Sequence, residues 1–146
     1  MLRFKTARIA SEWASDKPKP LLRAIIDQMT EVARVLYDAD VTLTCVYRTQ
    51  EEDAALYHEA SHSPGVHCYW RGADVSVIMF TFSQVKELCA RANDRFKYDP
   101  ERPWMRCAIF EATGEPGVTA PHIHVQMTST TVDVGPVMDA EVGQVL

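Results

Sequence analysis

Two histidines separated by a single residue stand in the segment Pro121-His122-Ile123-His124. Side chains alternate between the two faces of a β-strand, so a strand here would direct His122 and His124 to one face and Ile123 to the other. Two imidazoles on one face could supply a metal ligand and a neighbouring acid, base or oxyanion group. The same pattern also fits two ordinary histidines on a half-polar strand.

An aspartate inside an apolar run is the second chemical signal. Asp74 lies in the mainly apolar residues 72–79, and a buried carboxylate needs a cation, a metal ion or several donors. His67 precedes it by seven residues. His67, Asp74 and one histidine of the His-x-His pair would form a zinc set with a fourth position open to water. The alternative is an ion pair between Asp74 and Arg71 or Arg48.

A rival zinc pattern, His-Glu-Ala-Ser-His, occupies residues 58–62. On a helix, its two histidines would bind zinc and its glutamate would act as a base. That arrangement requires a helix that continues past the second histidine. Ser63-Pro64-Gly65 follows at once, and the residue before a proline is disfavoured in a helix. We therefore interpret residues 58–62 as a coincidental match at a solvated helix end.

Arg48 lies where a predicted strand turns into a predicted helix. Its planar guanidinium could hold a substrate carboxylate through two parallel hydrogen bonds. An ion pair with the acidic run at residues 51–53 is the alternative.

The elements that must position these groups follow from hydrophobic periodicity and from capping and turn residues. The pattern predicts helices over residues 21–37, 49–59 and 83–96, the last capped by Ser83, and strands over residues 41–47, 72–79, 105–112 and 122–128. Residues 1–20 are expected to be irregular, with an extended lead-in at Lys17-Pro18-Lys19-Pro20, and the last residues are poorly patterned. The fold class is therefore predicted as α+β, with a small antiparallel sheet of about four strands and helices packed on it.

Length, composition and charge favour one domain over residues 1–146, with its core at about 21–128. The formal charge is −5, which argues against nucleic acid as a partner. No apolar run approaches the length of a membrane span. The N-terminus lacks the apolar region of a signal peptide, so we expect synthesis in the cytoplasm. The four cysteines are well separated and are expected to be reduced thiols, mostly in the core.

These pieces occur in a familiar order: Tyr-Arg-Thr at a strand end, a short helix, His-x6-Asp, a second helix and His-x-His. Over about residues 41–128 the chain resembles the D-alanyl-D-alanine carboxypeptidase-like metallopeptidases, which share their zinc fold with lysostaphin-type endopeptidases and the hedgehog signalling domain. The resemblance implies that His67, Asp74 and His124 bind zinc. It also implies that His122 is the companion histidine and that Arg48 helps to bind substrate.

The family pattern reads S-x-H-x-x-G-x-A-x-D, and this chain has Gly65, Trp70 and Gly72 where serine, glycine and alanine are expected. The family also has an acidic general base three residues before the last zinc histidine, and that position is Pro121 here. Glu115 and Glu111 are the nearest acidic substitutes.

We therefore expect a zinc-dependent hydrolase that cleaves peptide bonds in peptidoglycan cross-links or stem peptides, of the kind that bacteriophage lysis enzymes or wall-recycling enzymes provide. Zinc would be bound by His67, Asp74 and His124, and catalysis would use His122 and Glu115. The partner would be a peptide or a peptidoglycan fragment. The protein would act either as part of a virion or after its release to the cell wall. The alternative is a non-catalytic zinc-binding virion or structural protein that retains the peptidase fold.

Overall fold

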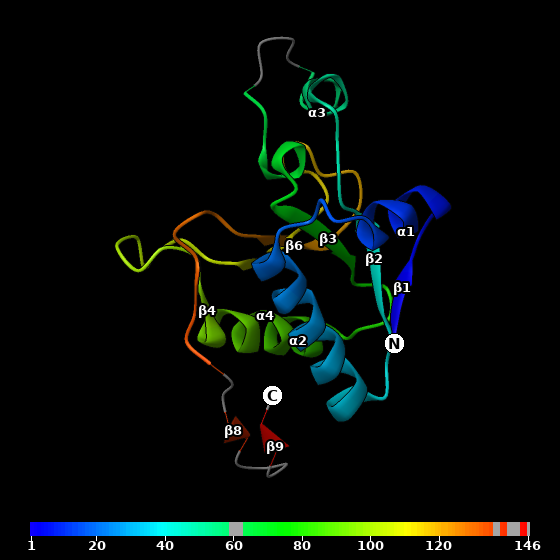
Figure 1. Cartoon of the computed structure of the whole chain (residues 1–146). Coiled ribbons are helices and arrows are strands. Elements are labelled where there is room, and N and C mark those ends of the chain that lie inside the picture. The colour runs from blue at the N-terminus through cyan, green and yellow to red at the C-terminus, as the bar shows by residue number, and fades with distance from the viewer. Residues whose placement is uncertain (59–62, 136–137, 140–143, 146) are drawn as a thin grey trace.

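The structure is a computed structural model that describes residues 1–58, 63–135, 138–139 and 144–145 (Figure 1). Its helices are α1 (Ala7–Ala14), α2 (Pro20–Tyr37), α3 (Gln50–Leu56), the 3₁₀ helix η1 (Val66–Tyr69) and α4 (Phe82–Arg95). Its strands are β1 (Leu2–Phe4), β2 (Val41–Cys45), β3 (Gly72–Ser76), β4 (Phe96–Lys97), β5 (Ala108–Glu111), β6 (His122–Gln126), β7 (Val132–Asp133), β8 (Met138–Asp139) and β9 (Gln144–Val145).

The main sheet has five strands in the order β1-β2-β3-β6-β5. The pairs β2–β3, β3–β6 and β6–β5 are antiparallel, whereas β1 is parallel to β2. Two small ladders, β4–β7 and β8–β9, lie apart from it. The α+β prediction is confirmed, and four of the sheet's strands were expected. The sheet is mixed rather than purely antiparallel because β1 adds a parallel edge strand.

The N-terminal residues form β1 and α1, so the prediction of an irregular N-terminal segment was wrong, whereas Lys19 before α2 is extended as expected. The Thr6 side chain accepts a hydrogen bond from the Ile9 amide and caps α1, which stabilises a helix start. Ile9 and Trp13, four residues apart on α1, are both buried in the core. This spacing of four residues is typical of a helix. Because α1 is only eight residues long and polar residues flank the pair, the pattern does not stand out in the sequence.

Helices α2 and α4 pack against each other and cover one face of the sheet (Figure 1). Pro20 begins α2 at its first turn, as expected, and Asp38 ends it in the left-handed conformation. Helix α4 begins at Phe82 and is capped by Thr81 in a capping box with Gln84, so the predicted Ser83 cap was wrong. Their buried side chains meet alternate strand residues, among them Leu43, Val75, Ile123 and Val125.

The other face of the sheet carries the polar alternates of the same strands. Thr42 and Thr44 on β2, Ser76 on β3 and His122 on β6 line an open groove there. The arrangement follows from the pleat, because each strand buries one set of side chains and presents the other. Within the part of the chain that the structure describes, no helix has the length and apolar character to cross a bilayer.

Candidate metal centre

Asp74 lies at the centre of the open sheet face, directly across from His124 in the β3–β6 ladder. The next pair on the same face joins Ser76 and His122. The alternation predicted for the His-x-His strand is therefore confirmed: Ile123 is fully buried on the opposite face. This register brings both histidines beside one carboxylate.

Three imidazole nitrogens converge on a single carboxylate oxygen. Asp74 Oδ1 lies 3.0 Å from His124 Nδ1, 3.3 Å from His67 Nε2 and 3.6 Å from His122 Nε2. With metal–nitrogen distances of about 2.0 Å, neighbouring ligand atoms of a tetrahedral site are about 3.3 Å apart. The observed separations bracket this value, so each imidazole lies at about ligand spacing from this carboxylate oxygen.

Helix η1 and the sharp turn that follows it place His67 beside Asp74. Trp70 ends η1 in the left-handed region, with φ of 60°, and its ring stacks on Tyr47 at 4.3 Å. The Arg71 amide then donates to the Val66 carbonyl at 3.0 Å. A Cβ at Gly72 would lie only 2.6 Å from Val66 Cγ2, so the close return of the chain requires glycine there.

The surroundings of His67 fix which nitrogen faces Asp74. Its Nδ1 lies 3.2 Å from the Val46 carbonyl oxygen. A carbonyl oxygen only accepts, so this contact places a proton on Nδ1. Nε2 is fully buried and makes no hydrogen bond of ordinary geometry, although it faces Asp74 Oδ1 at 3.3 Å. A buried lone pair opposed to a carboxylate requires a positive charge between them.

The pKa values of His67 and Asp74 both indicate that a positive charge is favoured between them. Burial lowers the pKa of His67, but the close contact with the negative charge of Asp74 outweighs burial and raises it to about 10. Burial raises the pKa of Asp74, but hydrogen bonds from His124 and His67 hold it well below its usual range. Either a proton or a metal cation can satisfy this pair.

Arg48 bridges two buried carboxylates. Its Nη1 lies 3.1 Å from Asp53 Oδ1 and its Nη2 lies 3.3 Å from Asp74 Oδ2. The two ion pairs that the sequence suggested for this arginine, with the acidic run at residues 51–53 and with Asp74, are therefore present together. Its side chain is only 18% exposed. Asp53 Oδ2 also accepts a hydrogen bond from the Gly65 amide at 3.1 Å. The chain Asp53–Arg48–Asp74 thus ties α3 and the His67 segment to the sheet.

Cys45 is a member of the cluster that the sequence analysis missed. Strict alternation along β2 would place Cys45 on the core face with Val41 and Leu43. A bulge between Leu43 and Cys45 changes the register and sets Cys45 opposite Asp74. Its Sγ lies 3.6 Å from His67 Nδ1. All four cysteines are free, as expected, but only Cys107 is fully buried.

Two overlapping groups of side chains could therefore hold a metal ion: Cys45 with His67 and Asp74, and Asp74 with His122 and His124. In each group the ligand atoms all lie within 4.8 Å of one another. The triad predicted from the sequence takes His67 from the first group and His124 from the second. Asp74 belongs to both, so it is the residue shared by the metal sites that the described residues could form on this face.

Glu111 stands next to the cluster, whereas Glu115 does not. Glu111 pairs with His122 across β5 and β6, and its Oε2 lies 3.0 Å from His122 Nε2. The other ring nitrogen, Nδ1, lies 2.8 Å from the Ala120 carbonyl oxygen. Glu115 is exposed in the following loop, and its Oε2 accepts a hydrogen bond from the Ala112 amide at 3.1 Å.

The rival pattern at residues 58–62 has no helix under its first histidine. Helix α3 ends at Leu56, and His58 adopts φ of 54°, which a helix cannot continue. Residues 59–62 lie outside the described part of the chain.

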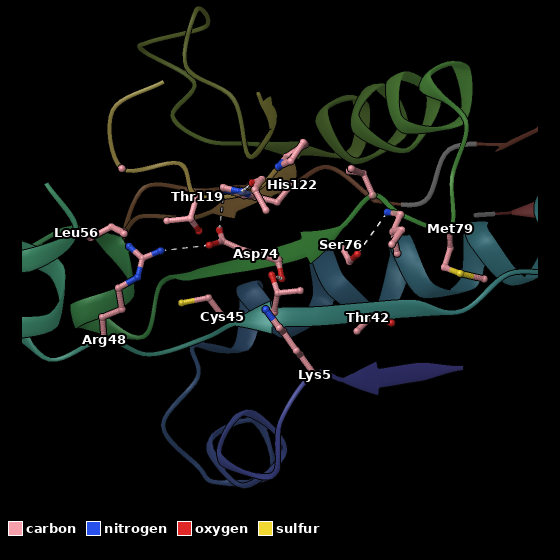
Figure 2. A pocket seen from close by; sticks show the side chains of 16 residues that line it. Lys5, Thr42, Cys45, Arg48, Leu56, Asp74, Ser76, Met79, Thr119 and His122 are labelled. Carbon is pink, nitrogen blue, oxygen red and sulfur yellow. Dashed lines mark hydrogen bonds and ion pairs between the residues drawn. The ribbon is translucent and has the colours of Figure 1, made fainter. Parts of the chain in front are cut away.

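Two adjoining cavities open onto the cluster. A cavity of about 290 Å³ is lined by His67, Asp74, His122 and His124. A larger groove of about 780 Å³ runs along the sheet face, and Arg48, Asp74 and His122 line both spaces. Figure 2 shows Arg48, Cys45 and Asp74 toward one end of the groove and Met79 toward the other. A ligand of several residues could therefore lie beside the histidines.

A scan of known protein families, a search of curated proteins and a search of solved structures each found no match to this chain. The functional argument therefore rests on the site itself.

Proposed function

We propose that this protein is a zinc-dependent hydrolase that cleaves peptide bonds in peptidoglycan cross-links or stem peptides. The observation that carries the proposal is the buried Nε2 of His67, which makes no hydrogen bond of ordinary geometry and faces Asp74 Oδ1 at 3.3 Å. A divalent cation between them would satisfy both groups, and imidazole and carboxylate are ligands that zinc accepts. The adjoining groove of about 780 Å³ provides room for a peptide.

In this proposal His67, Asp74 and His124 hold the zinc ion. The Val46 carbonyl orients His67 by accepting from its Nδ1, as outer groups commonly do for metal-binding histidines. Arg48 orients Asp74 through Oδ2 and leaves Oδ1 for the metal. When bound, zinc would polarise the scissile carbonyl and lower the pKa of water to about 7.

We assign the general base to Glu111 rather than to Glu115. Glu111 Oε2 is 3.0 Å from His122 Nε2, whereas the Glu115 carboxylate is occupied in its own loop. Both ring nitrogens of His122 face acceptors, the Ala120 carbonyl and Glu111. With substrate bound, the Nε2–H of His122 would turn from Glu111 to the developing oxyanion, which would free Glu111 to take a proton from water.

Two local features support the family resemblance on which the substrate class rests. The family pattern has glycine where this chain has Trp70, and Trp70 adopts φ of 60°, the left-handed conformation that favours glycine. This local conformation is consistent with the glycine of the pattern and supports the resemblance at this position. Arg48, at the groove wall, presents an edge that a substrate carboxylate could meet.

The proposal is tested first by metal content and then by hydrolysis. Wild-type protein and the variants His67→Ala, His124→Ala and His58→Ala are purified without a metal-affinity tag. We expect about one zinc per chain in the wild type and in His58→Ala, and loss of zinc in the other two variants. Hydrolysis of soluble peptidoglycan fragments should stop on chelation and return with zinc.

Folded wild-type protein that binds no added zinc would refute the proposal. Zinc binding at these residues without hydrolysis would instead support the non-catalytic alternative, which Pro121 favours because it stands where the family has its acidic base. A Glu111→Gln variant separates the two roles of the site. It should keep its zinc and lose hydrolysis by about 100-fold or more, as expected for removal of a general base.

A further inference from the structure

The bulge in β2 places a thiol on the polar face of the sheet, where the groove lies. Cys45 lies opposite Asp74 in the ladder and lines the groove beside Arg48. It is partly exposed, unlike the buried core thiol of Cys107. Bulges often re-aim one side chain toward a functional site. Here the bulge removes a small apolar residue from the core and directs a sulfur atom at the cluster.

A second feature of the same place points to a ligand. His67 is 3% exposed, and its buried Nε2 has no hydrogen-bond partner among the described residues. The ligand atoms of Cys45, His67 and Asp74 all lie within 4.8 Å of one another. In a tetrahedral site with one sulfur ligand these separations are about 3.5 Å. The Cys45 sulfur lies 3.6 Å from His67 Nδ1, so binding one ion together with Nε2 and Asp74 requires rotation about the single Cys45 side-chain bond.

We propose that Cys45 is a metal ligand, and that it binds a thiophilic divalent ion together with His67 and Asp74. The inference rests on the proposed metal site and adds a sulfur atom to it. The Arg48 guanidinium lies beside the cluster and, with a divalent ion, balances the negative charges of the thiolate and the two buried aspartates. A mixed sulfur, nitrogen and oxygen set favours zinc over magnesium or calcium.

A sulfur ligand also has a consequence for the proposed reaction. With His124 as well, the protein would fill all four positions of a tetrahedral ion, which is the pattern of a closed site. Cys45 would then hold the resting site closed, and water could reach the ion only after the thiolate moved away.

The test uses cobalt as a spectroscopic substitute for zinc. The full chain is stripped with a chelator and titrated with Co²⁺, as wild type, Cys45→Ser and Cys68→Ser. The wild type and Cys68→Ser should each bind one equivalent and show the near-ultraviolet absorption of a cobalt–thiolate bond. Cys45→Ser should lack that absorption and bind Co²⁺ about tenfold or more weakly. Cys68 is the matched control because it is also partly exposed and lies one residue after His67.

Stoichiometric Co²⁺ binding without the thiolate absorption would overturn the inference and leave the proposed metal site intact. Absorption that survives in Cys45→Ser, or disappears in Cys68→Ser, would also overturn it. A folded wild type that binds no Co²⁺ and no zinc would refute the proposed function itself. Should Cys45→Ser fail to fold, alkylation of the wild type decides: metal should slow modification of Cys45 about tenfold or more and leave Cys68 unchanged.

Discussion

Replacing Arg48 by methionine should destabilise the metal-free protein strongly. The guanidinium lies between Asp53 and Asp74, whose side chains are 2% and 6% exposed. Methionine keeps much of the volume and removes the charge, so both buried carboxylates lose the cation that they share. Removing one partner from a buried ion pair costs about 3–5 kcal/mol. For a chain of this length, that corresponds to a fall in Tm of about 6–20 °C.

A second arginine provides a matched control. Arg8 also contacts two carboxylates, Glu12 at 3.0 Å and Glu52 at 2.9 Å, but its side chain is 54% exposed. Its contacts are shorter than those of Arg48, so a judgement by distance alone would rank Arg8 as the more important residue. Exposed pairs contribute only about 0–1 kcal/mol. We therefore expect Arg8→Met to lower the free energy of unfolding by less than about 1 kcal/mol.

The assay is urea unfolding followed by tryptophan fluorescence, with chelator and with excess zinc. The double variant Arg48→Met/Asp53→Asn should recover part of the loss, because it removes one of the two buried negative charges that Arg48 balances in the wild type. Zinc should also recover part of it by neutralising Asp74. The reasoning is refuted if Arg48→Met loses no more stability than Arg8→Met in the metal-free state.

Three further predictions concern the metal, pH and packing. Zinc at 100 times its Kd should stabilise the wild type by about 2.7 kcal/mol, and Asp74→Asn should show no such gain in a thermal shift assay; an equal gain would exclude Asp74 as a ligand. The hydrogen bond from Arg8 lowers the pKa of Glu52 from 4.5 to about 2, so the unfolded chain binds more protons between these values and the stabilisation is present above pH 4.5 and lost toward pH 2. The free energy of unfolding of the wild type should therefore exceed that of Glu52→Gln by less than about 1 kcal/mol at pH 6, and the two should be equal near pH 2. A difference that does not depend on pH would contradict the lowered pKa of Glu52. Gly72→Ala places a Cβ 2.6 Å from Val66 Cγ2 and should lower the free energy of unfolding by about 1–3 kcal/mol. The double variant Gly72→Ala/Val66→Ala should lose less stability than the two single variants added together. An additive loss would show that the contact with Val66 is not the cause.

Local patterns in the sequence were enough for three of the helices, for four strands of the main sheet and for the face on which most site residues lie. Period-two alternation placed His122 and His124 together, because a strand must direct alternate side chains to opposite faces. The helical spacing and Pro20 located α2, and the apolar run around Asp74 indicated a buried strand. These inferences succeeded because each depends on residues that are neighbours along the chain.

Tertiary structure decided which groups meet. The bulge that turns Cys45 toward Asp74 arises from the pairing of β2 with β3, and no periodicity within β2 reveals it. Glu111 reaches His122 through the register of β5 with β6, whereas Glu115, nearer to His122 along the chain, lies in a loop. Arg48 joins Asp53 and Asp74 across three segments. Cross-strand register and the burial of charge depend on the whole fold, so only the assembled sheet determines the composition of the site.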